Sequence, residues 1–335
     1  MKKYRDYTIE IVLKSPLVTP FHSDTIFGHI CWAIRFLYQN GEDKLCEFLK
    51  TYDTEESPPL LVSNGLPIGY LPKPVIPPIT QEELEGVIGK ENRVKDSFKV
   101  KAIRKLTLIP KYNFSQLQAE IITPLKLFKV MSESYETVLK ELTEEQCVVV
   151  QHNTVNRIEG KVKRGLYSQE EIFYSPGTGK FVVYLKTYYF TKNDIYRIFT
   201  YIGEEGFGRD KSTGKGYFEF DESNIKEGIY LPETEKPNAF MTLSSYIPSG
   251  KDPTQGYYNI IHKFGKLGGL YAKGISEVYG NPFKMPLIMF SAGSTFYDNN
   301  YFNGKIYGSL IRNVHQNDKI RHYAYAFPVG INLEV

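Results

Sequence analysis

A glycine-rich, basic loop between a predicted helix and a predicted strand restricts the fold of this chain more than any other segment. It lies within GEEGFGRDKSTGKGYFEF, residues 203–220. Apolar residues in 195–202 recur at the i, i+3, i+4 and i+7 spacing of an amphipathic helix. The aromatic residues of 217–220 favour a strand. Nucleotide-binding glycine motifs instead follow a strand and open a helix, so this order is wrong for them.

The spacing inside the loop also differs from the known phosphate motifs. The P-loop motif is G-x-x-x-x-G-K-[ST], whereas five residues separate Gly208 from Gly214. A dinucleotide-binding turn would need a third glycine at the position of Lys211. Two interpretations remain open. The loop is either an anion-binding site, in which consecutive backbone N–H groups face a phosphate, or a surface turn whose glycine caps the preceding helix.

Composition excludes several classes of protein. The chain has 335 residues, which favours two domains, and its formal net charge is +3. A nucleic-acid surface would therefore be a local patch rather than a field over the whole molecule. The three cysteines show no C-x-x-C spacing and no histidine cluster, so we expect no metal, no cofactor, no disulfide framework and a reducing compartment. The N-terminal residues lack the apolar core of a signal peptide, and no apolar run approaches about 18 residues, so we expect a cytoplasmic protein without membrane contact.

Periodicity predicts a strand and a helix at the start of the chain. Residues 7–14 alternate apolar and polar side chains, as a half-buried strand does. A helix follows, capped by Ser23 or Asp24 and ending before Gly41. The next stretch, 57–78, is rich in proline, which lacks the backbone donor that a regular helix or a central strand needs.

Further elements complete a recognisable order. Residues 81–105 are charged and predicted to be helical, with a solvated face as the simplest interpretation of the charges. The run FVVYLKTYYF, residues 181–190, predicts a strand. With the helix and the glycine-rich loop, the order is the β-α-β-β-α-β of a ferredoxin-like fold with an insertion. We therefore expect an α+β protein of two ferredoxin-like (RRM-like) domains, residues 1–221 with a helical insertion at about 57–146, and a degenerate second unit at 222–335.

Histidine is the side chain best suited to acid–base chemistry near neutral pH, and the chain has six. His22 precedes the first predicted helix, beside Ser23 and Asp24, where it could act as a general base in RNA cleavage or hydrogen-bond to a phosphate. His29 lies one turn into that helix. The other four have no obvious partner, and no metalloprotease, hydrolase or deaminase motif is present. The sequence therefore gives little support to an enzyme.

The segment NRIEGKVKRG, residues 156–165, is a second basic stretch. Its alternate side chains would project from one face of a hairpin arm, and Lys and Arg supply affinity for phosphates without reading sequence. The aromatic residues Tyr167, Phe173 and Tyr174 could stack on exposed RNA bases. A charged surface hairpin is the alternative interpretation. Two basic segments in one domain, with a helix N-terminus as a third anion site, favour RNA binding.

Several stretches together carry a resemblance to a known family. They are PFHSDTIFGHICWAIR, LPIGYLPKP, HNTVNRIEG with GLYSQEEIF, and GFGRDKSTGKGYFEF, and the C-terminal GKIYGSLI and HYAYAFPVGI are similar too. A β-α-β-β-α-β unit with a glycine-rich loop between its second helix and last strand resembles the RAMP superfamily of CRISPR proteins. More narrowly, the chain resembles the fourth Csm subunit of type III-A effector complexes over nearly its whole length. The likeness to the type III-B counterpart is weaker.

This resemblance implies a non-catalytic subunit that grips the repeat-derived 5′ tag of the crRNA. It implies two protein partners, the large polymerase-domain subunit and the first backbone RAMP subunit. It also implies a thumb-like β-hairpin around residues 153–165 in the first domain. The residues that cleave target RNA in these complexes belong to a different subunit, and no matching set is found here. The implied RNA-binding residues are His22, Ser23, Gly206, Gly208, Arg209, Lys211, Ser212, Thr213 and Lys215, with Asn153, Arg157, Lys161, Lys163 and Arg164 in the basic segment.

Two other functions stay open on the sequence alone. One is a RAMP-type, metal-independent endoribonuclease that processes CRISPR precursor RNA with His22 as its base. The other is an RRM-like RNA chaperone that binds generic single strands. The charged segment at 81–105 matches no element of the family, so the resemblance gives it no role.

Overall fold

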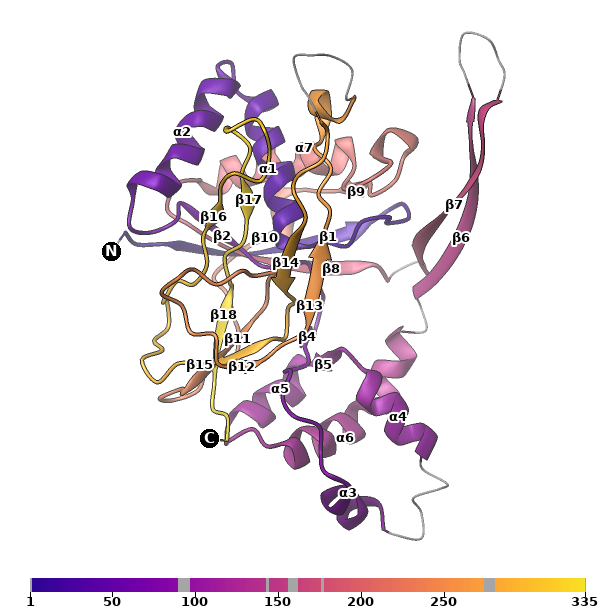
Figure 1. Cartoon of the computed structure of the whole chain (residues 1–335), viewed down its shortest axis with the longest axis vertical. Coiled ribbons are helices and arrows are strands. Elements are labelled where there is room, and N and C mark those ends of the chain that lie inside the picture. Colours follow the sequence, from indigo (N-terminus) through magenta and orange to yellow (C-terminus); the bar gives the residue numbers. More distant parts are fainter. Residues whose placement is uncertain are drawn as a thin grey trace.

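The computed structural model describes residues 2–89, 97–142, 145–155, 162–175, 178–273 and 281–334. The fold is mixed α and β, as predicted, with antiparallel sheets and helices that gather in two places. In Figure 1, one group of helices lies above the first sheet, a second group lies at the bottom of the molecule, and a long hairpin stands apart from both.

The first sheet is built around β1 (Arg5–Leu13), which confirms the strand predicted from alternation at 7–14. Its strand order is β10-β1-β8-β2, and all of its pairs are antiparallel. Taken in chain order these are the fourth, first, third and second strands. Two short strands extend it, β3 beside β8 and β9 beside β1. The remaining bounds are β2 Leu60–Val62, β3 Leu66–Pro67, β8 Lys180–Thr187, β9 Phe218–Glu219 and β10 Ile225–Glu227.

Three helices lie together on one face of this sheet (Figure 1). They are α1 (Ser23–Leu37), α2 (Gly41–Thr54) and α7 (Lys192–Glu205). The predicted cap of α1 is wrong. The N-cap is His22, whose side chain makes no capping hydrogen bond. Neither Ser23 nor Asp24 caps the helix, because the Ser23 hydroxyl turns into the core and the Asp24 carboxylate turns to Lys263.

The lower helical group follows the proline-rich stretch. It contains α3 (Gln81–Ile88), α4 (Ser97–Lys105), α5 (Lys111–Gln118) and α6 (Pro124–Leu142). The helices predicted in 81–105 are thus confirmed as α3 and α4. A two-stranded ribbon, β4 (Tyr70–Pro72) paired with β5 (Leu108–Pro110), lies beside these helices. The predicted insertion is not purely helical, because β2 and β3, which fall inside it, are strands of the first sheet.

The second sheet has the order β12-β15-β11-β18. In chain order these are its second, third, first and fourth strands, which is the order of the first sheet read from the opposite edge. No α-helix connects its strands within the described parts of 243–327, where the one helical element is the short 3-10 turn η4 (Gly269–Lys273). Two separate ribbons occupy these connections instead, β13 with β14 and β16 with β17. The bounds are β11 Ala239–Thr242, β12 Gly256–Tyr257, β13 Ile260–Lys263, β14 Leu287–Phe290, β15 Thr295–Tyr297, β16 Leu310–Ile311, β17 His322–Tyr323 and β18 Pro328–Ile331.

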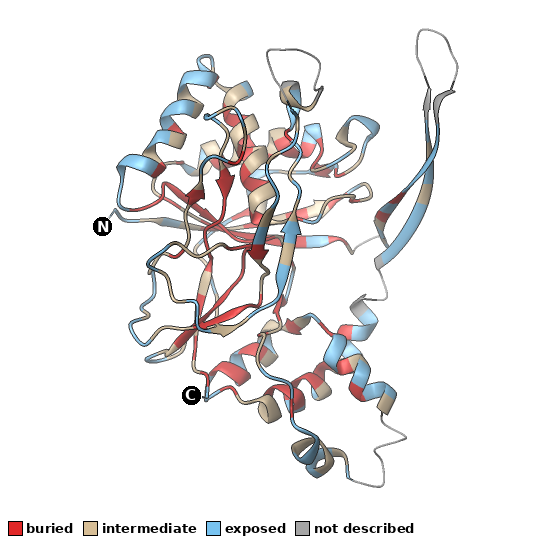
Figure 2. Cartoon of the chain, viewed as in Figure 1, coloured by how far each residue is buried: buried red, intermediate tan, exposed pale blue. Residues whose placement is uncertain are grey.

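One hydrophobic core runs through both sheets (Figure 2). The ring of Tyr323 stacks on Phe27 of α1 with centroids 5.0 Å apart, and its hydroxyl accepts a hydrogen bond from the backbone N–H of Val62. A buried polar link lies nearby, where the side-chain oxygen of Asn64 accepts from the N–H groups of Ser23 and Ser245. β10 also joins the first sheet beyond residue 221, the predicted boundary. No described helix is long and apolar enough to cross a membrane.

Candidate nucleic-acid interface

The glycine-rich loop connects α7 to β9, in the order predicted from the sequence. It begins at Gly206, which caps α7 with φ 83°, and contains a short 3-10 turn, η2 (Lys211–Thr213). Its four glycines all have positive φ, a backbone conformation that other residues rarely adopt. Two of them also make close approaches. A Cβ on Gly208 would lie 2.6 Å from the Thr19 Cβ, and one on Gly216 would lie 2.1 Å from the Phe207 carbonyl oxygen.

Several backbone N–H groups of the loop bind the protein itself. The N–H of Gly208 donates to Nε2 of His29 over 2.9 Å, and the N–H of Arg209 donates to the Thr19 hydroxyl over 3.0 Å. The predicted anion site therefore does not use these two donors in this structure. Among the described residues, none accepts from the N–H groups of Lys211 and Ser212 at the start of η2. These two groups are the candidate backbone donors for a phosphate.

The three predicted cations of the loop differ in their surroundings. The side chain of Arg209 is 64% exposed and lies 3.7 Å from Asp210. Lys211 forms a surface ion pair with Glu205 at 2.9 Å. Lys215 is mostly buried and pairs with Glu171, whose side chain is fully buried. Arg209 and Lys211 can therefore turn toward an RNA phosphate, whereas Lys215 neutralises a buried carboxylate.

The long hairpin of β6 (Glu145–Val155) and β7 (Val162–Tyr174) is attached at its base to this loop. Besides the Lys215–Glu171 ion pair, Gln169 donates to the Asp210 carboxylate over 2.6 Å, and His152 lies 3.0 Å from Glu171. The hairpin then extends away from the body (Figure 1). Loop and hairpin thus form one connected surface.

The structure describes only part of the predicted basic segment. Asn153 is exposed on β6, and Lys163 and Arg164 belong to β7, where Arg164 pairs with Thr154. Arg157 and Lys161 lie outside the described residues. The pairing of β6 with β7 confirms the predicted hairpin arm for residues 162–165, the part of this stretch that the structure describes.

The other two predicted contacts are His22, which is partly buried, and Ser23. Ser23 is fully buried, and its hydroxyl accepts from the N–H of Ser245. Its predicted contact with RNA is therefore replaced by a structural role. Nδ1 of His22 accepts from Lys263 at 2.7 Å, and Lys263 also pairs with Asp24 at 2.8 Å. Burial and the Lys263 charge lower the pKa of His22 to about 4, although Asp24 opposes them.

Sequence reasoning missed the residues that hold the loop in place. His29 accepts from Gly208 and stacks on Phe207, with ring centroids 4.6 Å apart. Burial, followed by the Lys211 charge, lowers the pKa of His29 to about 3, so the ring is neutral at pH 7. Thr19 and Glu171 were missed as well, because their partners lie far along the chain and no local pattern marks them.

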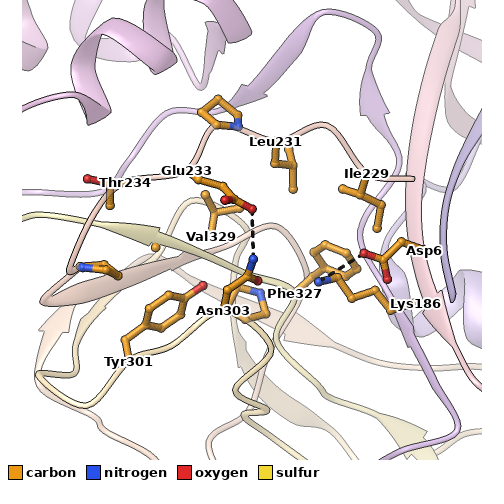
Figure 3. Close-up of a pocket in the computed structure, with 14 residues that line it drawn as sticks. Asp6, Lys186, Ile229, Leu231, Glu233, Thr234, Tyr301, Asn303, Phe327 and Val329 are labelled. Carbon is orange, nitrogen blue, oxygen red and sulfur yellow. Dashed lines mark hydrogen bonds and ion pairs between the residues drawn. The ribbon is translucent and has the colours of Figure 1, made fainter. Parts of the chain in front are cut away.

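A pocket of about 130 Å³ lies elsewhere, between the segment after β10 and strand β18 (Figure 3). Its polar side chains are already paired, Asn303 with Glu233 at 3.0 Å and Lys186 with Asp6 at 3.9 Å. No predicted RNA-binding residue lines it. It is also smaller than the roughly 300 Å³ at which ligand pockets begin. We assign it no ligand.

Taken together, the sheet order and the anchored basic loop define an α+β protein with a candidate RNA-binding surface. The profile of the RAMP superfamily matches residues 13–219, which is more than half of the chain, and the chain belongs to that superfamily. No curated protein matches it significantly.

Solved structures of similar fold come from CRISPR complexes. A chain in the crystal structure of a Csm1-Csm4 cassette with AMPPNP has a TM-score of 0.54 at 16% identity, with 99% of this chain and 100% of that chain covered. A chain in the same cassette with cA4 gives the same values. A chain in the Csm3-Csm4 subcomplex of the type III-A CRISPR-Cas interference complex has a TM-score of 0.55 at 16% identity, with 98% and 99% covered. At this identity the likeness establishes the fold.

Proposed function

We propose that this chain is a non-catalytic, crRNA-binding subunit of a type III-A CRISPR-Cas effector complex in the cytoplasm, which grips the 5′ tag of the crRNA. The observation that carries the proposal is the loop after α7, which is fixed to the body through His29 and Thr19 and leaves Arg209 exposed. Membership of the RAMP superfamily and the likeness to chains of Csm complexes support it. The same likeness supports treating both sheets as ferredoxin-like units, the second without α-helices among its described residues.

The chemistry of the loop suits a sugar–phosphate backbone. Arg209 offers a planar, permanently charged guanidinium, and Lys211 offers an ammonium held by only one surface ion pair. The N–H groups of Lys211 and Ser212 add fixed donors at the start of η2. Hydrogen bonds to His29 and Thr19 already hold the backbone at Gly208 and Arg209, so binding should require little further ordering of the backbone there.

The proposed partners are a large polymerase-domain subunit and a backbone RAMP subunit. The structurally similar chains come from Csm1-Csm4 and Csm3-Csm4 assemblies, so the fold occurs in complexes with two kinds of neighbour. The hairpin of β6 and β7, which extends from the loop, is the proposed thumb that lies against the RNA.

The environment of His22 disfavours the endoribonuclease alternative. A general base works best with a pKa near the operating pH, whereas the pKa of His22 is lowered to about 4. Its Nδ1 also accepts a hydrogen bond from Lys263 at 2.7 Å. We therefore propose that His22 has a structural role and that the chain does not cleave RNA.

The test is RNA binding by the chain co-purified with its cognate large subunit. We expect a crRNA with the 5′ tag to bind at least tenfold more tightly than the same RNA without it. Arg209→Ala/Lys211→Ala should remove most of this preference and reduce the salt slope by about 0.7 per lost cation. Lys226→Ala, which removes an exposed cation on β10, is the matched control and should bind like the wild type.

Each outcome has a clear meaning. Equal binding of both RNAs, unchanged in the loop variant, would overturn the tag-binding role and favour a generic RNA chaperone. Cleavage of repeat RNA in EDTA that is lost in His22→Ala would establish the endoribonuclease instead.

A further inference from the structure

Three aromatic side chains form a partly exposed cluster where α1 packs against α7. Trp32 and Phe36 lie one turn apart on α1, with their ring centroids 5.6 Å apart and their ring planes inclined by only 16°. The ring centroid of Tyr201, on α7, lies 6.2 Å from that of Phe36. Phe36 is 51% exposed, and Trp32 and Tyr201 are partly exposed. We call these three residues the aromatic platform.

The two rings on α1 do not belong to the buried side of that helix. The buried residues of α1 are Ser23, Ile26, Phe27, Ile30, Ala33 and Ile34. Trp32 and Phe36 instead continue a row that begins at His29, because positions i, i+3 and i+7 share one face of a helix. A ring that stays half exposed gains only part of the free energy of burial. Packing within the chain therefore does not account for Phe36 at this position.

The segment that contains η4 holds Trp32 in place. A Cβ on Gly268 would lie 2.9 Å from Nε1 of Trp32, and one on Gly269 would lie 2.7 Å from its Cη2 atom. The guanidinium of Arg35 lies over the rings of Trp32 and Tyr271, at 5.5 and 5.8 Å from their centroids. Because these contacts already position the indole, stacking of a ligand on the aromatic platform should require little further ordering of this side chain.

The aromatic platform continues the surface of the glycine-rich loop. His29, which accepts a hydrogen bond from that loop, precedes Phe36 by seven residues on α1. At 1.5 Å per residue this separation is about 10 Å along the helix axis, or about three nucleotides at the 3.4 Å spacing of stacked bases. On α7, Tyr201 lies one turn before Glu205, which pairs with Lys211 of the loop. An RNA strand whose phosphates bind the loop therefore has its next bases within reach of the aromatic platform.

We propose that the aromatic platform binds an unpaired base of the crRNA 5′ tag by stacking, within about three nucleotides of the phosphates that the loop holds. This inference rests on the proposed function, because the RNA strand reaches the platform from the loop. Unpaired RNA bases typically stack on aromatic rings and on arginine guanidinium planes, and here Arg35 lies beside the rings. Continuity with the loop, where Arg209 is exposed, favours RNA over a protein partner. Every base has a π face, so stacking here does not require one particular tag sequence.

The experiment uses the chain co-purified with its cognate large subunit, and tagged crRNAs that carry one abasic nucleotide at each tag position in turn. An abasic nucleotide keeps the phosphate and removes the base. We expect at least one of these RNAs to bind the wild type about tenfold more weakly than intact crRNA does. Phe36→Leu, which keeps an apolar side chain without a π face, should bind intact crRNA about tenfold more weakly. The same abasic nucleotide should then cause no further loss in this variant.

Three further variants separate stacking from a general loss of apolar surface. Tyr201→Leu changes the aromatic platform from α7 and should weaken binding in the same way, without relying on the integrity of α1. Phe36→Tyr keeps a π face and should bind like the wild type. Phe98→Leu makes the matched change at a ring that is 83% exposed on α4, and it should also bind like the wild type. Melting temperatures check that all variants remain folded.

Equal losses with the abasic RNAs in the wild type, Phe36→Leu and Tyr201→Leu would overturn this inference. Unchanged crRNA affinity in both leucine variants, with weaker binding of the large subunit, would also overturn it and assign the aromatic platform to a protein contact. In both cases a loss of tag preference in Arg209→Ala/Lys211→Ala would leave the proposed function standing. If the wild type binds tagged and untagged crRNA equally, the proposed function fails, and this inference fails with it.

Discussion

The backbone N–H of Gly208 donates to Nε2 of His29 over 2.9 Å, although the two residues are 179 positions apart in the sequence. This bond fixes the glycine-rich loop against α1. It also fixes the tautomer of His29, because a nitrogen that accepts a hydrogen bond carries no proton, so the proton of the neutral ring lies on Nδ1. Protonation of Nε2 would remove the acceptor and release the loop.

We therefore expect the free energy of unfolding to fall as the pH is lowered. Burial lowers the pKa of His29 to about 3 in the folded chain. The unfolded chain therefore binds a proton at this residue near pH 6.5, whereas the folded chain binds it only near pH 3. The stability that neutral His29 contributes is fully present above pH 6.5 and is lost progressively as the pH falls toward 3. The loss for this residue is up to about 1.4 kcal/mol per pH unit.

Urea denaturation at several pH values measures this slope. His29→Gln keeps an acceptor but has no proton to bind, so its slope should be shallower than the wild-type slope. Equal slopes for the two proteins would show that His29 does not contribute. Burial also lowers the pKa of His22 and of His322 to about 4, so a slope remains in the variant.

Two glycines of the loop should differ in their response to alanine. Both Gly214 and Gly216 have positive φ, which costs an alanine about 1–2 kcal/mol. Gly214 faces open space, whereas a Cβ on Gly216 would lie 2.1 Å from the Phe207 carbonyl oxygen. Gly216→Ala should therefore lower the free energy of unfolding by about 1–3 kcal/mol more than Gly214→Ala does. Equal losses in urea denaturation would contradict the close approach.

The ion pair of Lys215 with Glu171 should be structural. Lys215→Met leaves a fully buried carboxylate without its ammonium partner, and we expect a loss of about 3–5 kcal/mol in the free energy of unfolding. Lys215→Met/Glu171→Leu should recover much of it, because no buried charge remains. Lys211→Ala, which breaks a surface pair, should cost less than about 1 kcal/mol. A small loss in Lys215→Met would instead mean that Lys215 is available to RNA.

Removal of the Lys263 ammonium should be visible in the titration of His22. Burial and the Lys263 charge both lower the pKa of this histidine to about 4. In Lys263→Met burial still lowers the pKa of His22 and Asp24 still raises it, so the pKa, measured by NMR, should rise above its wild-type value. Lys266→Met, three residues further along, is the control and should leave the pKa unchanged. An unchanged value in both variants would contradict the contact.

The parts of the fold that sequence predicts well are those with long periodic patterns. Strand β1 and the helix α7 follow directly from apolar spacing, because one face of each is buried along many residues. The second half is different. Its sheet strands are two to four residues long, too short to show a period, and only the pairing of distant segments reveals their order.

The candidate site was predictable in its location but not in its detail. Glycines and cations mark the loop in the sequence, yet nothing local distinguishes the exposed Arg209 from Lys215, which neutralises a buried carboxylate. The same holds for Ser23, whose burial depends on Asn64 and Ser245. Residues that act through distant partners need the folded structure to be recognised.

The position of β18 has a consequence for the order in which this chain folds. This strand pairs with β11 and adds Val329 and Ile331 to the core that both sheets share. The edge of β11 therefore stays open until residues 328–331 arrive from a distant part of the chain. During that interval the unpaired edge of β11 can pair with another chain, so aggregation competes with completion of the second sheet.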